Sequence, residues 1–256
     1  MDPARRVITL LTDFGTADGY VGELKGVLLS GAPDATILDI THDIPAQDVE
    51  YARLVVARVW RRFPTGTIHL VVVDPGVGSS RAALAIEADG RCLVGPDNGV
   101  LSPALLVAGA RAARLPVPSG ASATFHGRDV FAPAAVSLAT GARVEDLGPE
   151  VSSPIVRRTP EAIRLADGRL RGEVIAIDRF GNAITNIVGL RGGGLELDGT
   201  ILPLRRAYAD VAHGEALAVV GSSGFIEIAV RNGSAAARFG LARGAPVIFR
   251  SADGAV

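Results

Sequence analysis

The chain has 256 residues, of which 48% are hydrophobic and 21% charged, a balance typical of a folded globular protein and not of a disordered one. A net charge of −1 argues against a nucleic-acid-binding protein, which needs a basic surface for the phosphates. The single cysteine, Cys92, excludes an intrachain disulfide. The apolar run at residues 7–11 is too short for a signal peptide or a membrane span, so we expect a cytoplasmic protein with no membrane partner.

Strands and helices are predicted to alternate in the first part of the chain. The continuous apolar run at 7–11 predicts a buried strand, residues 35–40 predict a second strand, and residues 68–73 predict a third, buried strand. Residues 18–30 suit a helix, and residues 47–63 carry apolar side chains at steps of three and four, which predicts an amphipathic helix.

Further elements are predicted beyond the third strand. Two strands are expected at 82–87 and 91–94, and a helix at 129–140 with Asp129 as its N-cap. The whole order predicts an N-terminal α/β domain with a mainly parallel sheet over residues 1–150.

The pattern changes in a linker region at 142–168, where prolines and scattered charges replace the periodic segments. Beyond the linker, helical periodicity nearly disappears and short apolar runs separated by Gly, Asp or Asn predict a smaller antiparallel β-domain over residues 169–256. The predicted strands lie at 172–177, 183–188, 194–197, 201–204, 216–220, 225–230 and 247–250.

Acidic residues stand at the ends of the first three predicted strands. Each of these strands is followed within a few residues by an aspartate: Asp13, Asp43 or Asp74. Ligands of open α/β sheets bind outside the carboxyl ends of the strands, so these positions predict a shared pocket. An isolated aspartate at such a position is usually a helix cap or a turn residue, and the prediction of a pocket depends on three of them in succession.

The segment 73–81 is the most unusual loop. Pro75 makes it stiff, the two glycines that follow permit close approach to a ligand, and no Lys-Ser or Lys-Thr pair completes a phosphate-binding loop. Arg81 is placed either to fold back onto Asp74 or to lie on the surface, and the sequence leaves both open. Among the four histidines, His126 has the best functional setting, just before a predicted helix.

Two segments of the second half are typical of turns: 176–186, a hairpin, and 221–225, rich in small residues. Neither indicates a function by itself. Together with five segments of the first half, however, they form an ordered set of motifs: Leu11-Thr12-Asp13-Phe14-Gly15, Thr41-His42-Asp43-Ile44-Pro45, Val73-Asp74-Pro75-Gly76-Val77-Gly78, Gly95-Pro96-Asp97-Asn98-Gly99, Thr124-Phe125-His126-Gly127-Arg128-Asp129, Ile177-Asp178-Arg179-Phe180-Gly181-Asn182 and Ser222-Ser223-Gly224-Phe225.

In these motifs and their order, the chain resembles the S-adenosyl-L-methionine hydroxide adenosyltransferases (SAM hydrolases), which are related to the fluorinase and chlorinase enzymes. The resemblance covers about residues 7 to 249. It implies an α/β domain followed by a β-barrel-like domain, and a homotrimer with the site between subunits. It also implies hydrolysis of S-adenosyl-L-methionine (SAM) to adenosine and methionine, without a cofactor.

The resemblance also implies residue roles. The family's catalytic trio falls on Asp74, Arg81 and His126. Halogenating relatives have Tyr, Thr and Ser where this chain has Asp74, Val77 and Gly127. Because a carboxylate repels halide and accepts a hydrogen bond from water, this difference implies hydrolysis and not halogenation.

Substrate-binding roles are carried over in the same way. Asp13 would take the ribose hydroxyls, and Asp178 and Ser222 the amino-acid end of the substrate. Asn182 would bind adenine, with Phe180 and Tyr208 facing the base. Gln47 stands where the halogenating relatives carry a Trp, and Ser223 where they carry an Arg.

Three other functions compete with this interpretation. One is a metal-dependent hydrolase built on Asp13, His42, Asp43 and Asp74, although the spacing of these ligands is poor. The second is a non-catalytic sensor of SAM or adenosine. The third is halide-dependent chemistry, which Asp74 and Gly127 disfavour.

Overall fold

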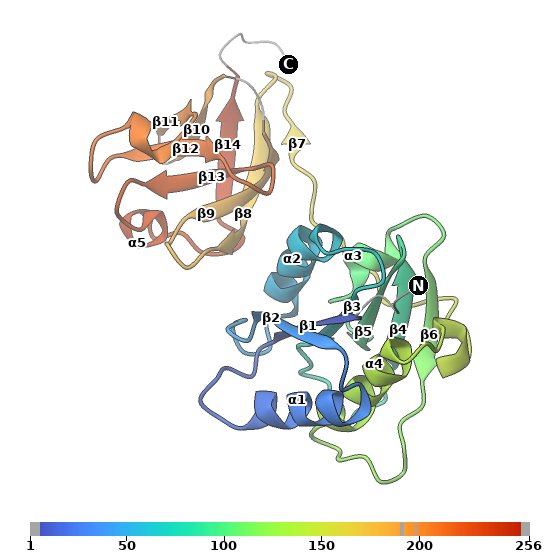
Figure 1. Ribbon diagram of the computed structural model, residues 1–256. Helices are drawn as coiled ribbons and strands as arrows, with labels where there is room; N and C mark the ends of the chain where they lie inside the picture. The colour runs from blue at the N-terminus through green and yellow to red at the C-terminus, as the bar shows by residue number, and fades with distance from the viewer. Residues whose placement is uncertain (1–5, 190–191, 198, 252–256) are drawn as a thin grey trace. The chain divides into compact units, whose positions relative to one another are not determined.

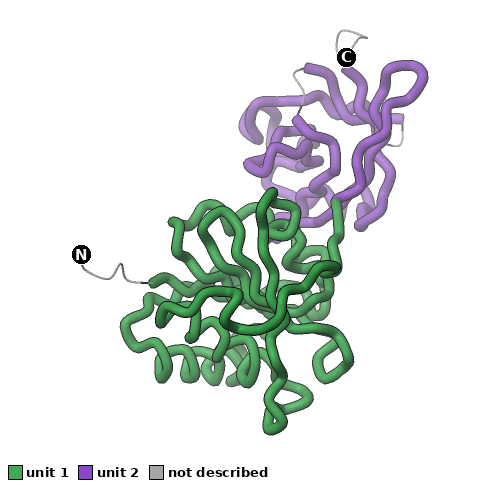
Figure 2. The backbone as a smooth tube through the Cα atoms, turned by 90° about the vertical axis from the view of Figure 1, so that its right-hand side faces the viewer, with its two compact units in different colours: residues 1–158 green, residues 159–256 purple. Residues whose placement is uncertain are grey.

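The computed structural model describes residues 6–189, 192–197 and 199–251. The chain divides into two compact units, and the boundary falls between Arg158 and Thr159, inside the region predicted as a linker (Figure 2). Among the residues that the structure describes, no helix has both the length and the apolar character to cross a membrane.

The first unit is a six-stranded sheet with helices on both faces (Figure 1). The strand order is β2-β1-β3-β5-β4-β6; β2, β1, β3 and β5 are parallel, whereas β4 is antiparallel to both of its neighbours. The prediction of a mainly parallel sheet is therefore confirmed. Its elements are β1 (Val7–Thr12), α1 (Tyr20–Gly31), β2 (Thr36–Thr41), α2 (Val49–Val59), a 3₁₀ turn (Trp60–Arg62), β3 (Ile68–Val72), β4 (Ala83–Ala88), β5 (Arg91–Pro96), α3 (Ser102–Leu105), β6 (Arg111–Leu115), a π-helical turn (Gly127–Phe131), α4 (Ala132–Ala139) and a second 3₁₀ turn (Val144–Leu147).

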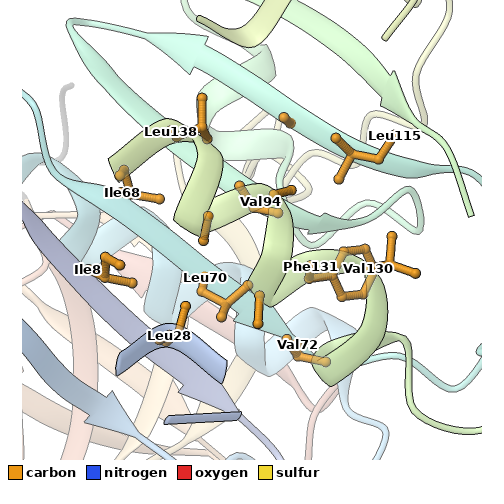
Figure 3. Packing of buried hydrophobic residues seen from close by; sticks show 14 of the residues in the cluster. Ile8, Leu28, Ile68, Leu70, Val72, Val94, Leu115, Val130, Phe131 and Leu138 are labelled. Atoms are coloured by element: carbon orange, nitrogen blue, oxygen red, sulfur yellow. The ribbon is translucent and has the colours of Figure 1, made fainter. Parts of the chain in front are cut away.

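The sheet is apolar on both faces because helices cover both. On one face, Ile8 of β1 and Leu70 of β3 pack with Leu28 of α1 and with Phe131 before α4 (Figure 3). On the other face, the next strand residues, such as Val71, join a second buried cluster with α2 and α3. Continuous burial explains why the strand sequences read as unbroken apolar runs.

Several elements were not predicted from the sequence. Strand β6 is one of them: it lies at the sheet edge, and exposed Arg111 and Arg114 interrupt its apolar signal. Helix α3 and α5 (Ala235–Phe239) are too short to show helical periodicity.

The prediction that Asp129 caps a helix is wrong. The helical segment begins earlier, with the π-helical turn that starts at Gly127, and the N-cap of α4 is Phe131. The Asp129 carboxylate instead accepts hydrogen bonds from the backbone N–H of Ser122 and from the side chain of Arg128.

The second unit is a closed seven-stranded barrel, which confirms the barrel-like prediction. Its strands run in the order β14-β10-β11-β12-β13-β9-β8, and pairing of β14 with β8 closes it. All these pairs are antiparallel except β11 with β12, which is parallel. The elements are β7 (Ile163–Arg164), β8 (Leu170–Ile177), β9 (Ala183–Val188), β10 (Gly194–Leu197), β11 (Thr200–Arg205), a 3₁₀ turn (Tyr208–Asp210), β12 (Ala216–Val220), β13 (Phe225–Val230), α5 and β14 (Pro246–Arg250).

Candidate active site

Asp74, Arg81 and His126 form one hydrogen-bonded unit at the carboxyl end of β3. Arg81 Nε donates to Asp74 Oδ1 at 2.9 Å, and Arg81 Nη2 donates to Asp74 Oδ2. The same Nη2 lies 2.9 Å from His126 Nδ1. The alternative left open by the sequence, a surface Arg81, is therefore wrong: the guanidinium joins the two other residues.

The unit is largely shielded from water. The side chains of Asp74 and Arg81 are 6% and 9% exposed, and the Arg81 guanidinium lies 5.3 Å from the centre of the Phe131 ring. A bidentate pair between guanidinium and carboxylate is a strong, directional contact, and it holds the carboxylate in one orientation.

The contact with Arg81 also defines the state of His126. A guanidinium has no acceptor, so Nδ1 of the histidine must accept, and the ring proton is on Nε2. Burial lowers the pKa of His126, and the charge of Arg81 lowers it further. The ring is therefore neutral at pH 7 and offers a single N–H donor.

Gly78 explains how the loop after β3 reaches the loop that carries His126. Its φ is +75°, and a Cβ atom there would lie 2.3 Å from the carbonyl oxygen of Ala123. Only glycine allows this backbone conformation together with such close approach. The contact brings residues 74–81 against residues 123–126, as the Arg81–His126 bond requires.

The segment after His126 is held by Arg128. Its guanidinium binds both carboxylate oxygens of Asp129 and donates to Glu23 of α1 at 2.8 Å, and it also lies over the ring of Phe125. The helix begins here with a π-helical turn, a feature that is frequent at functional sites.

Asp13 follows β1, and its loop contacts the His126 loop. The rings of Phe14 and Phe125 meet edge to face with centres 5.7 Å apart. One carboxylate oxygen of Asp13 accepts from the backbone N–H of Gln47 at 2.7 Å. Gln47 itself has a φ of +65°, an uncommon conformation for a residue with a side chain, and such positions cluster at functional sites.

The four residues of the metal-hydrolase alternative do not converge. Asp43 is exposed, whereas His42 is buried, with Nδ1 2.8 Å from Thr12 Oγ1 and Nε2 3.1 Å from Asp39. In the described part of the chain, no group of three or more His, Cys, Asp or Glu side chains is arranged to hold a metal ion.

Asn98 supports the site, and no role was predicted for it from the sequence. Its amide Nδ2 donates to the carbonyl of Val73 at 2.9 Å, and its Oδ1 accepts from the N–H of Val100. It thereby holds the residue before Asp74. Its place in the Gly95–Gly99 motif was the only available signal.

In the second unit, Asp178 and Asn182 close the turn between β8 and β9. The Asp178 carboxylate accepts from the backbone N–H of Phe180, and from the backbone N–H and side-chain amide of Asn182, each at 2.9 Å. Gly181 has a φ of +80° and lies against Ser234. The Phe180 side chain is left 76% exposed.

Tyr208 lies near two carboxylates of the same unit. Its hydroxyl donates to Glu227 at 3.4 Å, and burial, followed by the charges of Glu227 and Asp178, raises the pKa of Tyr208. Ser222 is exposed in the turn before β13. Glu227, which is 7% exposed, was not singled out from the sequence, although a glutamate within the apolar run of β13 is a signal.

Comparison with known proteins places the chain in a family. Residues 8–148 match the SAM hydroxide adenosyltransferase N-terminal domain, and residues 172–248 match the C-terminal domain of the same family. A protein of Thermus thermophilus named (R)-S-adenosyl-L-methionine hydrolase is 43% identical, over 94% of this chain and 98% of its own length.

Two further proteins are similar over nearly the whole chain. A solved structure from Thermotoga maritima, described as an uncharacterized conserved protein, superposes with a TM-score of 0.86 at 33% identity, covering 94% of this chain and 99% of its own. A fluorinase of Nocardia brasiliensis is 29% identical, over 95% of this chain and 96% of its own length. The chain belongs to the SAM hydroxide adenosyltransferase family.

Proposed function

We propose that this protein hydrolyses S-adenosyl-L-methionine to adenosine and L-methionine by attack of water on C5′ of the ribose. The observation that carries the proposal is the hydrogen-bonded unit of Asp74, Arg81 and His126, in a chain of the SAM hydroxide adenosyltransferase family. A pure binding protein has no need of a shielded carboxylate that is held in one orientation.

The sulfonium substrate has a good leaving group, because methionine departs as a neutral thioether. The oxygen of water forms a bond to C5′ while the C5′–S bond breaks, and the bonding electron pair stays on sulfur. The sulfonium becomes the neutral thioether of methionine, and one proton of the water is released. The protein therefore has to position the water and stabilise its developing hydroxide character.

Each member of the unit has a role in that step. Asp74 orients the water and accepts its proton. Arg81 holds the carboxylate in place with two hydrogen bonds, and its charge favours a hydroxide-like nucleophile. His126 donates its Nε2–H to the water oxygen, because its Nδ1 already accepts from Arg81.

The same residues favour water over halide. The Asp74 carboxylate occupies the place of a Tyr in the halogenating relatives, and Val77 and Gly127 supply no hydroxyl. A shielded negative charge raises the free energy of a bound halide ion but accepts a hydrogen bond from water.

The remaining roles are part of the proposal. Asp13 binds the ribose hydroxyls, Asp178 and Ser222 bind the amino-acid end, and Asn182, Phe180 and Tyr208 surround the adenine. The protein acts as a cytoplasmic homotrimer, with each site between subunits, and it uses no cofactor. Size-exclusion chromatography with light scattering tests the trimer.

The test of the function is product analysis with both epimers of the substrate. Because the relative from Thermus thermophilus is named for the (R) form, the (R) and (S) sulfonium epimers are each incubated with the protein, with and without chelator. We expect equal amounts of adenosine and methionine from at least one epimer, unaffected by the chelator, and loss of most turnover with Asp74→Asn. Saturable binding without products would refute hydrolysis, and inhibition by chelator would restore the metal-dependent alternative.

A further inference from the structure

A line of polar contacts runs from the surface of the first unit to the residue that precedes Asp13. Lys25 Nζ of α1 lies 2.6 Å from Asp39 Oδ2 of β2, and Asp39 Oδ1 lies 3.1 Å from His42 Nε2. His42 Nδ1 lies 2.8 Å from the hydroxyl of Thr12. The line begins at half-exposed side chains and ends at Thr12, which is fully buried.

The direction of the hydrogen bonds follows from the groups involved. His42 Nε2 lies 3.1 Å from a carboxylate oxygen of Asp39, where an unprotonated nitrogen would be repelled, so the ring proton is on Nε2 and Nδ1 accepts from the Thr12 hydroxyl. The Thr12 oxygen in turn accepts from the backbone N–H of Phe14 at 3.3 Å. His42 therefore selects one orientation of the Thr12 hydroxyl, and that hydroxyl holds the turn around Asp13.

His42 also holds the far side of the same turn. Its backbone carbonyl accepts from the N–H of Gly15 at 2.8 Å. Asp13 is thus fixed between two anchors on His42, and one of its carboxylate oxygens is already bound to the N–H of Gln47. The backbone of the turn is therefore held at two points, and the contact with Gln47 restricts the rotation of the Asp13 carboxylate.

We propose that His42 is the positioning residue for Asp13 and sets the protein's selectivity for ligands with a vicinal diol. Two neighbouring hydroxyls bind one carboxylate well only when its oxygens face both, which is a matter of orientation rather than charge. The inference rests on the proposed function through the ribose-binding role of Asp13. The other contacts of the line act through His42: Lys25 and Asp39 hold its ring, and Thr12 transmits its position.

The experiment measures binding, by titration calorimetry, of adenosine and of 2′,3′-dideoxyadenosine, which lacks both hydroxyls. In the wild type we expect adenosine to bind more tightly. His42→Ala should lower the affinity for adenosine about tenfold and leave that for dideoxyadenosine unchanged, since each good hydrogen bond to a charged group contributes about a factor of ten. His42→Asn, whose amide oxygen can replace Nδ1 as the acceptor for Thr12, should recover part of the loss.

A matched control is available three residues earlier on β1. The buried pair Thr9 and His69 makes the same contact at 2.7 Å, in the middle of the sheet and away from Asp13. His69→Ala should therefore lower stability without altering the ratio of the two affinities. If His42→Ala does not fold, Thr12→Val, which removes the hydroxyl but keeps the shape, should give the same loss of selectivity.

The outcomes separate this inference from the proposed function. The inference would be overturned if the His42 variants weakened the binding of adenosine and dideoxyadenosine equally, so that the ratio of the two affinities did not change. It would also be overturned if His42→Ala lowered the affinity for adenosine by the same factor in a protein that already carries Asp13→Ala. A wild type that does not prefer adenosine would overturn both the inference and the role of Asp13. The proposed hydrolysis of SAM is tested separately, by product formation, and does not depend on the result of the binding experiment.

Discussion

Replacement of Arg81 by lysine keeps a positive charge at the centre of the site but removes the forked shape of the guanidinium. Arg81 makes two hydrogen bonds to Asp74 and one to His126, and two of the three distances are 2.9 Å. A single ammonium on a shorter reach keeps at most one of these contacts. The variant therefore separates the effect of charge from the effect of orientation.

The magnitude follows from the number of bonds lost. Hydrogen bonds to charged groups contribute about 1.5–3 kcal/mol each, so two lost bonds amount to roughly 3–6 kcal/mol. If that loss is expressed fully in the transition state, kcat falls by roughly 100- to 10,000-fold, because about 1.4 kcal/mol corresponds to a factor of ten. The affinity for adenosine should change little, since Arg81 is proposed to act on the water.

The assay is the rate of adenosine formation at saturating SAM, together with the Kd of adenosine. Arg61→Lys is the matched control, because Arg61 pairs with Asp89 on the surface, where its side chain is 56% exposed. We expect that control to retain full activity. An Arg81→Lys enzyme with kcat within about fivefold of the wild type would show that charge alone suffices, and would refute the argument from orientation.

Two further predictions concern stability. Gly78→Ala should lower the free energy of unfolding by at least about 2 kcal/mol, and should reduce turnover, because the new Cβ would meet the Ala123 carbonyl in a backbone conformation that favours glycine. His69 is buried, and burial lowers its pKa to about 4. Between pH 6.5 and pH 4, His69 is therefore protonated in the unfolded chain but neutral in the folded chain. The contribution of His69 to the free energy of unfolding should therefore be constant above pH 6.5, and the free energy of unfolding should fall by about 3 kcal/mol between pH 6.5 and 4. Denaturant titrations across this pH range measure both effects.

Each prediction has a control within the chain. Gly214 has a φ of +78° but open space around it, so Gly214→Ala should lose only about 1 kcal/mol. If Gly78→Ala and Gly214→Ala lowered the free energy of unfolding equally, the contact of the new Cβ at position 78 with the Ala123 carbonyl would not be destabilising. His69→Gln should show a shallower decline in acid than the wild type, and parallel curves for the two proteins would contradict the assignment to His69.

Much of the fold could be predicted from local pattern. The apolar runs of β1 and β3 are continuous because helices cover both faces of the sheet, and the short runs between glycines in the second unit match barrel strands such as β9, β12 and β13. Edge strand β6 escaped prediction because its exposed arginines give no apolar signal. The ordered motifs placed the chain in its family, since seven motifs in one order are specific where each alone is not.

The sequence by itself determined the fold class, the family and the residue types available for chemistry. Only the tertiary structure decided the pairing of Arg81 with Asp74 and His126, the burial of His42 against Thr12, and the support from Asn98. These contacts join residues that are 7, 45, 30 and 25 positions apart. Periodicity and spacing report local conformation, whereas the partner of a polar side chain depends on which loops the packed sheet brings within hydrogen-bond distance.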